Sequence, residues 1–161
     1  MQATQDTTID YDAIITGLTQ RANDPKILKW IGVSMADKPT ALKEWRTIGV
    51  CTPRQSGSKA WMVQQMRENH EATLITVNIP LRNHILSELG DGFEDRVFTC
   101  YEIARLSRAW RKDIAGTPKM NLGKVTYIDT PDVCFGVVKR SHFYNWLAHH
   151  VDLDHLIIKM G

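Results

Sequence analysis

TIGVCTPRQSGSKAW, residues 47–61, is a stretch in which the character of the sequence changes twice. Residues 47–51 are rich in β-branched side chains, residues 52–57 are polar and contain a proline and a glycine, and the residues from Ser58 onward have helical spacing. β-Branched residues favour strands, whereas Pro, Gly and Ser favour turns. The stretch therefore predicts a strand, a loop and a helix in succession, which is the repeating unit of an α/β protein.

The same alternation continues to the end of the sequence. Further strands are predicted at 72–79, 96–103, 124–129 and 155–160, and helices at 58–70, 80–91, 104–116 and 138–151. The strands are too continuously apolar to expose one face to water, as is typical of buried parallel strands. We therefore predict an α/β fold: a three-layer sandwich with a mostly parallel sheet of about five strands, whose ligand crevice lies at the carboxyl ends of the strands.

The region before the first strand has a different pattern. The first dozen residues are polar and predict a loose tail. Residues from Tyr11 to about Met35 carry apolar side chains at helical spacing and predict two short helices. We therefore divide the chain into a polar tail with a helical extension, 1–44, and an α/β core, 45–161.

Composition limits the classes of function. With 161 residues, of which 43% are apolar, the chain suits one compact domain. A formal net charge of +2 is too small for a protein that coats nucleic acid, so an anionic partner must bind a local patch. No apolar run approaches the roughly 18 residues that span a bilayer. Cys51, Cys100 and Cys134 lie in apolar surroundings and predict buried reduced thiols, so we expect a cytoplasmic protein with no membrane partner.

The loop after the first strand resembles the phosphate-binding pattern GxxxxGK[ST], in which backbone N–H groups cradle phosphates and the Lys reaches the terminal ones. Here Thr52 replaces the first Gly, Gly57 keeps the second, and Ser58 and Lys59 stand in exchanged order. One position along a helix turns a side chain by about 100°, so Lys59 is expected to point away from the usual direction. The predicted phosphate contacts are Thr52, Pro53, Arg54, Gln55, Ser56, Gly57, Ser58, Lys59 and Ala60. The alternative is an ordinary polar turn.

A second motif supports the nucleotide interpretation. The apolar strand 124–129 ends in Asp129, which resembles the Walker B aspartate that holds Mg²⁺. We predict Mg²⁺ ligation by Asp129 with Ser58, and catalytic roles for Lys59, Asp129 and Asp132. The glutamate that usually follows the Walker B aspartate is absent, and Asp132 is its candidate replacement, although Pro131 fixes the intervening backbone. The alternative is an acidic turn at a strand end.

Residues 45–161 resemble the P-loop NTPase core of viral DNA-packaging terminases and helicases. The resemblance rests on the order of the motifs: TPRQSG, the strand TLITVNI, the strand VTYID and a final strand HLIIKMG. It implies ATP and Mg²⁺ as cofactors and a viral DNA transaction, packaging or helicase-like, as the process served or regulated. The exchanged loop and the missing glutamate imply nucleotide binding with weak or absent hydrolysis. The exchanged order belongs either to a natural degenerate ATPase that keeps the fold as a binding platform, or to a loop that originally read Gly-Lys-Ser and in which two residues were swapped.

Two other functions remain open. One is a non-enzymatic protein that binds a host or viral partner, or another copy of itself, and keeps a vestigial loop. The other is a sulfotransferase-like protein, because a run of Pro, a basic residue, Ser, Gly and Ser followed by Trp also resembles the loop that cradles a 5′-phosphosulfate without metal. In that family Ser58 would be normal, but Gln55 is an extra residue.

Basic and histidine-rich segments add further candidates. Arg105, Arg108, Arg111 and Lys112 lie at near-helical spacing around Trp110, which predicts a nucleic-acid face with a stacked base. The alternative is a solvated basic helix with Trp110 in the core. The segment HHVDLDH, 149–155, suggests a metal site, but adjacent helical residues do not share a face. The five tryptophans are expected to pack helices onto the sheet.

Overall fold

The five predicted strands pair side by side in one sheet. In a computed structural model of the protein, which describes residues 8–33 and 37–161, every pair of neighbouring strands is parallel. The strands are β1 (Thr47–Val50), β2 (Ala72–Thr76), β3 (Val97–Thr99), β4 (Val125–Asp129) and β5 (Leu156–Met160). Their order across the sheet is β1-β5-β4-β2-β3, so β5 lies between the strand that precedes the loop and the strand that ends at Asp129. The predicted α/β fold with a parallel sheet is confirmed.

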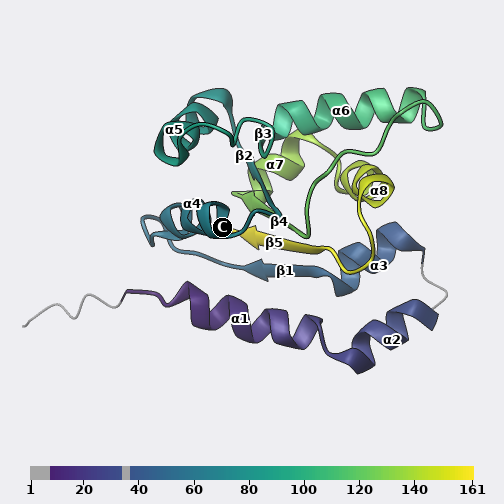
Figure 1. The fold of residues 1–161 in the computed structure, drawn as a ribbon, viewed down its shortest axis with the longest axis horizontal. Coiled ribbons are helices and arrows are strands. Elements are labelled where there is room, and N and C mark those ends of the chain that lie inside the picture. Colours follow the sequence, from purple (N-terminus) through teal and green to yellow (C-terminus); the bar gives the residue numbers. More distant parts are fainter. Residues whose placement is uncertain (1–7, 34–36) are drawn as a thin grey trace, which may run out of the picture.

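Eight helices in the described part of the chain surround this sheet (Figure 1). They are α1 (Tyr11–Ala22), α2 (Pro25–Val33), α3 (Lys38–Trp45), α4 (Ser58–Glu68), α5 (Ile79–Leu89), α6 (Cys100–Lys112), α7 (Pro131–Val137) and α8 (Arg140–His150). One buried cluster joins the sheet to α1, α4 and α5, and another joins it to α3, α6 and α8. The sheet is therefore covered on both faces, consistent with a three-layer sandwich.

Burial explains why the strands are apolar throughout. Every residue of β2 and β4 is buried. Because successive side chains of a strand point to opposite faces, the neighbours Tyr127 and Ile128 belong to different buried clusters. Both faces of the sheet therefore need apolar residues, and the alternating polar pattern of a half-exposed strand is missing.

Two predicted strands end earlier than expected because helix caps interrupt them. β3 stops at Thr99, whose hydroxyl accepts a hydrogen bond from the Glu102 backbone N–H at 3.1 Å, while the Glu102 carboxylate accepts one from the Thr99 N–H at 2.7 Å. This reciprocal capping box starts α6 at Cys100, inside the predicted strand 96–103. In the same way, Asn78 caps α5 through the Leu81 N–H at 3.0 Å and ends β2 before residue 79.

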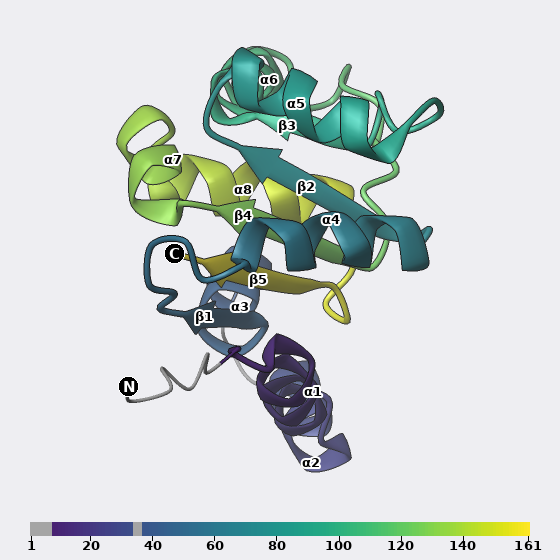
Figure 2. The ribbon, with the colours of Figure 1, turned by 90° about the vertical axis from the view of Figure 1, so that its left-hand side faces the viewer.

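The helical extension lies beside the β1 edge of the sheet (Figure 2). Its first helix begins at Tyr11, where the helical spacing predicted it, because the Asp10 carboxylate caps the Ala13 N–H. The predicted loose tail overlapped this helix and is wrong at its last two residues. Residues 1–7 of that tail, and the end of the second predicted helix at 34–35, lie outside the described residues. Residues of α1 and α3 contribute to the two buried clusters, so the extension and the core share them.

A buried arginine joins the extension to the core. Arg46 is 1% exposed and donates hydrogen bonds to the carbonyl oxygens of Ala22, Asp154 and His155 and to the side chain of Asn23. Burial lowers the pKa of its guanidinium, but the group stays charged, since an arginine pKa lies far above neutral pH. One side chain therefore fastens the end of α1 to the loop before β5.

The cysteines differ from the prediction in one respect. All three are free, and Cys100 and Cys134 are buried, but Cys51 is exposed because it lies just after β1, where the chain leaves the sheet. Within residues 8–33 and 37–161, no helix combines the length and apolar character that a membrane span requires.

A candidate phosphate-binding cleft

A cleft of about 450 Å³ lies at the carboxyl ends of β1, β4 and β5. Its lining combines the loop after β1 with the ends of the two neighbouring strands. The lining residues are Thr52, Pro53, Arg54, Gln55, Ser56, Gly57, Ser58, Lys59, Asp129, Thr130, Met160 and Gly161. Parallel strands bring their carboxyl ends to one edge of the sheet, and this is where ligands of open α/β sheets bind. Among the predicted phosphate and catalytic residues, all of them described, only Ala60 and Asp132 lie outside the lining.

The loop reaches the helix through two left-handed residues. Gln55 has φ 56° and Gly57 has φ 82°, and Gly57 is the N-cap of α4. Within the described chain no side chain caps α4, so N–H groups of its first turn remain available to an acceptor. These donors and the positive end of the helix dipole favour an anion beside Ser58 and Lys59.

Lys59 lines the cleft and faces the strand that ends in Asp129. Its ammonium nitrogen lies 4.0 Å from the Asp129 carboxylate oxygen Oδ2. The exchanged order predicted that this side chain would point away from the phosphate site. The four-carbon stem instead brings the ammonium group back toward the sheet, and the Lys59 side chain is 55% exposed on the open side of the cleft.

Asp129 is almost completely buried and is oriented by two hydroxyl groups. Thr76 donates to its Oδ2 at 3.4 Å and Thr130 donates to its Oδ1 at 3.1 Å. Burial raises the pKa of the Asp129 carboxyl, and Lys59 and the two hydroxyl groups oppose part of that rise. The folded protein therefore holds a carboxylate that would gain from a cation.

The cleft lining contains two oxygen-bearing side chains that could contribute to a magnesium site. Mg²⁺ is usually bound by one or two carboxylates together with substrate phosphates and water. Ser58 and Asp129 both line the cleft. No group of three or more His, Cys, Asp or Glu side chains that could hold a metal occurs in the described parts of the chain. These residues fit Mg²⁺ bound with a phosphate ligand and do not form a site for a metal alone.

Asp132 lies on the solvent side of a short helix that the sequence analysis did not predict. Thr130 has φ 50°, and Pro131 begins α7 directly after it. This turn carries the chain away from the cleft after Asp129, so Asp132 is exposed and lies outside the lining. The structure thus separates the candidate replacement for the missing glutamate from the other predicted residues.

Sequence reasoning missed Thr130, whose hydroxyl donates to Asp129, and three contributors from more distant parts of the sequence. Met160 and Gly161 enter because β5 lies beside β1, and the Gly161 N–H donates to the Val50 carbonyl at 3.0 Å. Tyr11 of α1 donates a hydrogen bond to the Ser56 hydroxyl at 2.5 Å. The predicted final strand was the only sequence signal for Met160 and Gly161. No sequence pattern indicated the long-range contact of Tyr11 with the loop.

The basic residues of α6 are exposed, but the tryptophan among them is not. Arg105, Arg108, Arg111 and Lys112 face solvent, whereas Trp110 is 9% exposed and packs against His149 with ring centroids 5.8 Å apart. The second sequence interpretation, a basic helix with Trp110 in the core, therefore describes α6. The four cations lie on the solvent face of α6, but Trp110 offers no face on which a base can stack.

The histidines near the end of the sequence make structural hydrogen bonds. His155 is buried between the Thr126 hydroxyl at 2.9 Å and the Gly123 carbonyl at 3.0 Å, and His150 accepts from the Met120 N–H at 2.9 Å. Burial lowers the pKa of each to about 4, so both are neutral at pH 7. Both ring nitrogens of His155 and Nδ1 of His150 make hydrogen bonds within the fold, whereas the buried Nε2 of His150 has no partner among the described residues. Because the described chain holds no group of three or more potential metal ligands, the suggested metal site has no support.

No protein-family model matches the chain, and searches of curated proteins and of solved structures find no significant match.

Proposed function

We propose that the cleft binds the phosphate groups of a nucleotide, ATP with Mg²⁺, and that the protein hydrolyses it weakly or not at all. One observation carries this proposal. The loop 52–59, the buried carboxylate of Asp129 and the ammonium group of Lys59 converge on one cleft at the carboxyl edge of a parallel sheet. The alternative, an ordinary polar turn between a strand and a helix, does not explain why a buried carboxylate and a lysine face each other beside the loop.

Each part of the cleft has a chemical role in this proposal. The backbone N–H groups at the start of α4 donate hydrogen bonds to the phosphate oxygens, and these contacts do not depend on the exchanged side chains. Lys59 neutralises a terminal phosphate oxygen, and its exposed ammonium group has room to move toward one. Asp129 and Ser58 would hold Mg²⁺, which would neutralise part of the phosphate charge.

Weak hydrolysis is expected because the described cleft lining has no second carboxylate to orient the attacking water. A water molecule that attacks a terminal phosphate needs a residue to orient it. Within the described lining, Asp129 is the only carboxylate, and its role is to bind the metal. Asp132 is turned into solvent by α7. The cleft is thus suited to hold a nucleotide and poorly equipped to cleave it.

The proposed process is a nucleic-acid transaction that the bound nucleotide serves or regulates. The exposed cations of α6, Arg105, Arg108, Arg111 and Lys112, supply phosphate contacts to DNA. Because the net charge of the chain is only +2, we expect this binding to be weak and to fall steeply as salt is added.

Calorimetric titration of ATP, with and without Mg²⁺, tests the nucleotide proposal. The wild-type chain is compared with the double variant Ser58→Lys, Lys59→Ser, which restores the usual loop order, and with Asp129→Asn. We expect Mg²⁺-dependent binding by the wild type, tighter binding by the restored loop, and loss of the Mg²⁺ dependence in Asp129→Asn. Absence of binding by both the wild type and the restored loop overturns the proposal.

Two further arms separate the alternatives. Hydrolysis by the restored loop alone would identify the exchange as the defect, whereas binding without hydrolysis by both proteins would point to the missing water-orienting acid. Adenosine 3′,5′-bisphosphate titrated without metal probes the sulfotransferase-like alternative. Tighter binding of that compound than of ATP with Mg²⁺ would favour a phosphosulfate site.

A second candidate function, binding of a protein partner, is favoured by an exposed aromatic pair that joins the extension to the start of the core. Trp30 and Trp45 contact each other with ring centroids 4.4 Å apart and are 49% and 39% exposed. Leu28 and Val33 of α2 are exposed as well. Exposed aromatic residues are enriched at protein interfaces. Light scattering across a range of concentrations tests whether the partner is a second copy, and Trp30→Ser should then shift the chain to monomer.

A further inference from the structure

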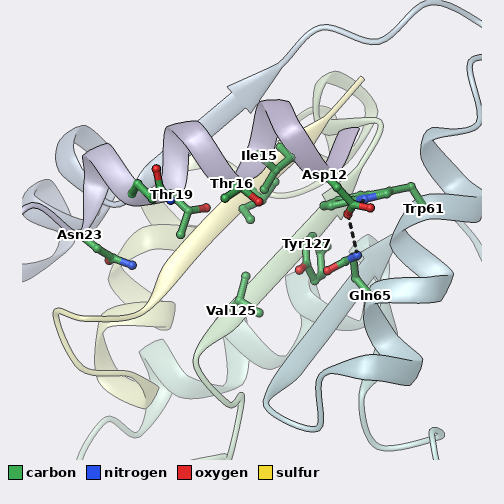
Figure 3. A pocket seen from close by; sticks show the side chains of 11 residues that line it. Asp12, Ile15, Thr16, Thr19, Asn23, Trp61, Gln65, Val125 and Tyr127 are labelled. Atoms are coloured by element: carbon green, nitrogen blue, oxygen red, sulfur yellow. Dashed lines mark hydrogen bonds between the residues drawn. The ribbon is translucent and has the colours of Figure 1, made fainter. Parts of the chain in front are cut away.

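A second cavity, of about 500 Å³, lies under the first helix (Figure 3). α1 is held at both ends. At its start the Asp12 carboxylate accepts a hydrogen bond from the Trp61 indole N–H at 2.8 Å, and at its end Arg46 donates to Ala22 and Asn23. The middle of α1 therefore spans the space between α4 and the sheet without filling it.

The cavity has an apolar floor and a polar roof. Val125 and Tyr127 of β4, Ile158 of β5 and Ile15 of α1 form the apolar part, and Trp61 and Gln65 of α4 form one wall. The polar groups on the α1 side belong to Asp12, Thr16, Thr19, Gln20 and Asn23. Small-molecule sites commonly have this size and this mixture of apolar walls with a few convergent polar groups.

Tyr127 lines the cavity with a side chain that is otherwise buried. Tyr127 is 4% exposed, and its hydroxyl makes no hydrogen bond with any described residue. Burial, and then the negative charge of Asp12, raise the pKa of this hydroxyl to about 12, so it keeps its proton at neutral pH. Tyr127 therefore presents an uncharged hydroxyl and the edge of an aromatic ring to the cavity.

The charge of the lining restricts the ligand. Asp12 is the only charged side chain among the described lining residues, and its carboxylate accepts only from the uncharged Trp61 and Gln65 side chains. An anion in this cavity would face Asp12 without a compensating cation. A cation would face both the carboxylate and the aromatic rings of Trp61 and Tyr127, which pack edge to face with centroids 5.6 Å apart.

We propose that the cavity under α1 binds a small aromatic amine, with the ring on the floor of Val125, Tyr127 and Ile158 and the ammonium group toward Asp12. This site is separate from the phosphate cleft, because the two share no lining residue. The outcome of a binding test at this site is therefore independent of the proposed nucleotide function.

Three probes that share the indole ring and differ in charge test the proposal. Tryptamine is a cation at neutral pH, indole-3-ethanol is uncharged and indole-3-acetate is an anion, and each is titrated into the full chain by calorimetry. We expect the affinity to fall in that order, and Asp12→Asn should reduce the preference for tryptamine over indole-3-ethanol by about fivefold, the effect of one near-surface charge pair. Equal or tighter binding of indole-3-acetate, or no binding of any probe at millimolar concentration, overturns the proposal.

A matched pair of helix variants locates the binding. Thr16→Trp fills the cavity from the exposed side of α1, while Ala13→Trp adds the same ring to α1 at an exposed position outside the lining. We expect Thr16→Trp to abolish tryptamine binding and Ala13→Trp to leave it unchanged, with circular dichroism showing that both variants are folded. Unchanged tryptamine binding by a folded Thr16→Trp variant would also overturn the proposal, since the ligand would then bind elsewhere.

Discussion

Asp129 shows how a single residue can reduce stability and still be suited to binding. The residue is 3% exposed at the end of a central strand, and its carboxylate accepts from two hydroxyl groups and lies 4.0 Å from a lysine ammonium group. Removing a charge from water costs free energy unless a partner compensates it, and the rise in its pKa reports an incomplete compensation. A bound cation would supply the missing partner.

We predict that Asp129→Asn stabilises the folded protein at pH 7. The pKa of Asp129 is higher in the folded than in the unfolded chain, so the ionised group costs stability above that pKa, and the cost fades as pH falls toward 3.8. The stabilisation by Asn should therefore be present at pH 7 and vanish near pH 4. Urea unfolding of wild type and variant at several pH values measures it, and a variant less stable than wild type at pH 7 would contradict the argument.

Gly57 is the loop residue whose backbone conformation demands glycine. Its φ of 82° is left-handed, yet a Cβ atom there would meet nothing within 4 Å. We predict that Gly57→Ala lowers the free energy of unfolding by about 1 kcal/mol, from backbone strain alone. Gly17→Ala is the control, because Gly17 lies inside α1 with equal space, and Ala there should stabilise by roughly 0.5–1 kcal/mol. Opposite signs in thermal unfolding are expected, and equal signs would reject the strain argument.

Helix caps decide where the elements of this fold begin. The strand prediction for 96–103 followed the apolar run and overlooked that Thr99 and Glu102 have the spacing of a capping box. The motif was present in the sequence, but β propensity and capping made opposite predictions for residues 100–103. The reciprocal hydrogen bonds, at 2.7 and 3.1 Å, favoured the helix.

We predict that the Thr99 cap contributes about 1 kcal/mol to stability. Thr99→Val keeps the buried shape and removes the hydroxyl that accepts from the Glu102 N–H, so it should lower the free energy of unfolding by roughly that amount. Thr99→Ser keeps the hydroxyl and serves as the companion. Urea unfolding should rank Val below Ser, and the reverse order would show that the lost methyl group matters more than the cap.

Arg46 holds distant parts of the whole molecule together. Its guanidinium joins the end of α1 to the loop before β5, across more than one hundred positions of sequence. Breaking a buried charged network leaves acceptors without partners, so we predict that Arg46→Met lowers the free energy of unfolding by about 3 kcal/mol or more. The amide hydrogens of α1 should also exchange faster. Arg67→Met is the control: Arg67 is exposed and donates to the Glu88 carbonyl, so its loss should cost about 1 kcal/mol or less.

The alternation of strands and helices, the parallel sheet and the position of the loop at its carboxyl edge were predictable from short stretches of sequence, although α7 was missed and the start of α6 was misplaced. They depend on propensities, turn residues and apolar runs, which act within a few positions of the chain. The order of the strands across the sheet was not predictable in this way. It places β5 between β1 and β4, which brings Met160 and Gly161 into the cleft.

Long-range packing also determined the position of Lys59, the exclusion of Asp132 and the cavity under α1. The exchanged Ser58-Lys59 order predicted a lysine turned away from the site, yet its ammonium group lies 4.0 Å from Asp129. Asp129 and Asp132 are three positions apart, but only the first lines the cleft. Such contacts depend on how far a flexible side chain reaches and where a turn sends the backbone, and both are set by neighbours distant in sequence. The local motif therefore indicated where a phosphate could bind, whereas the packed fold determined which side chains face it.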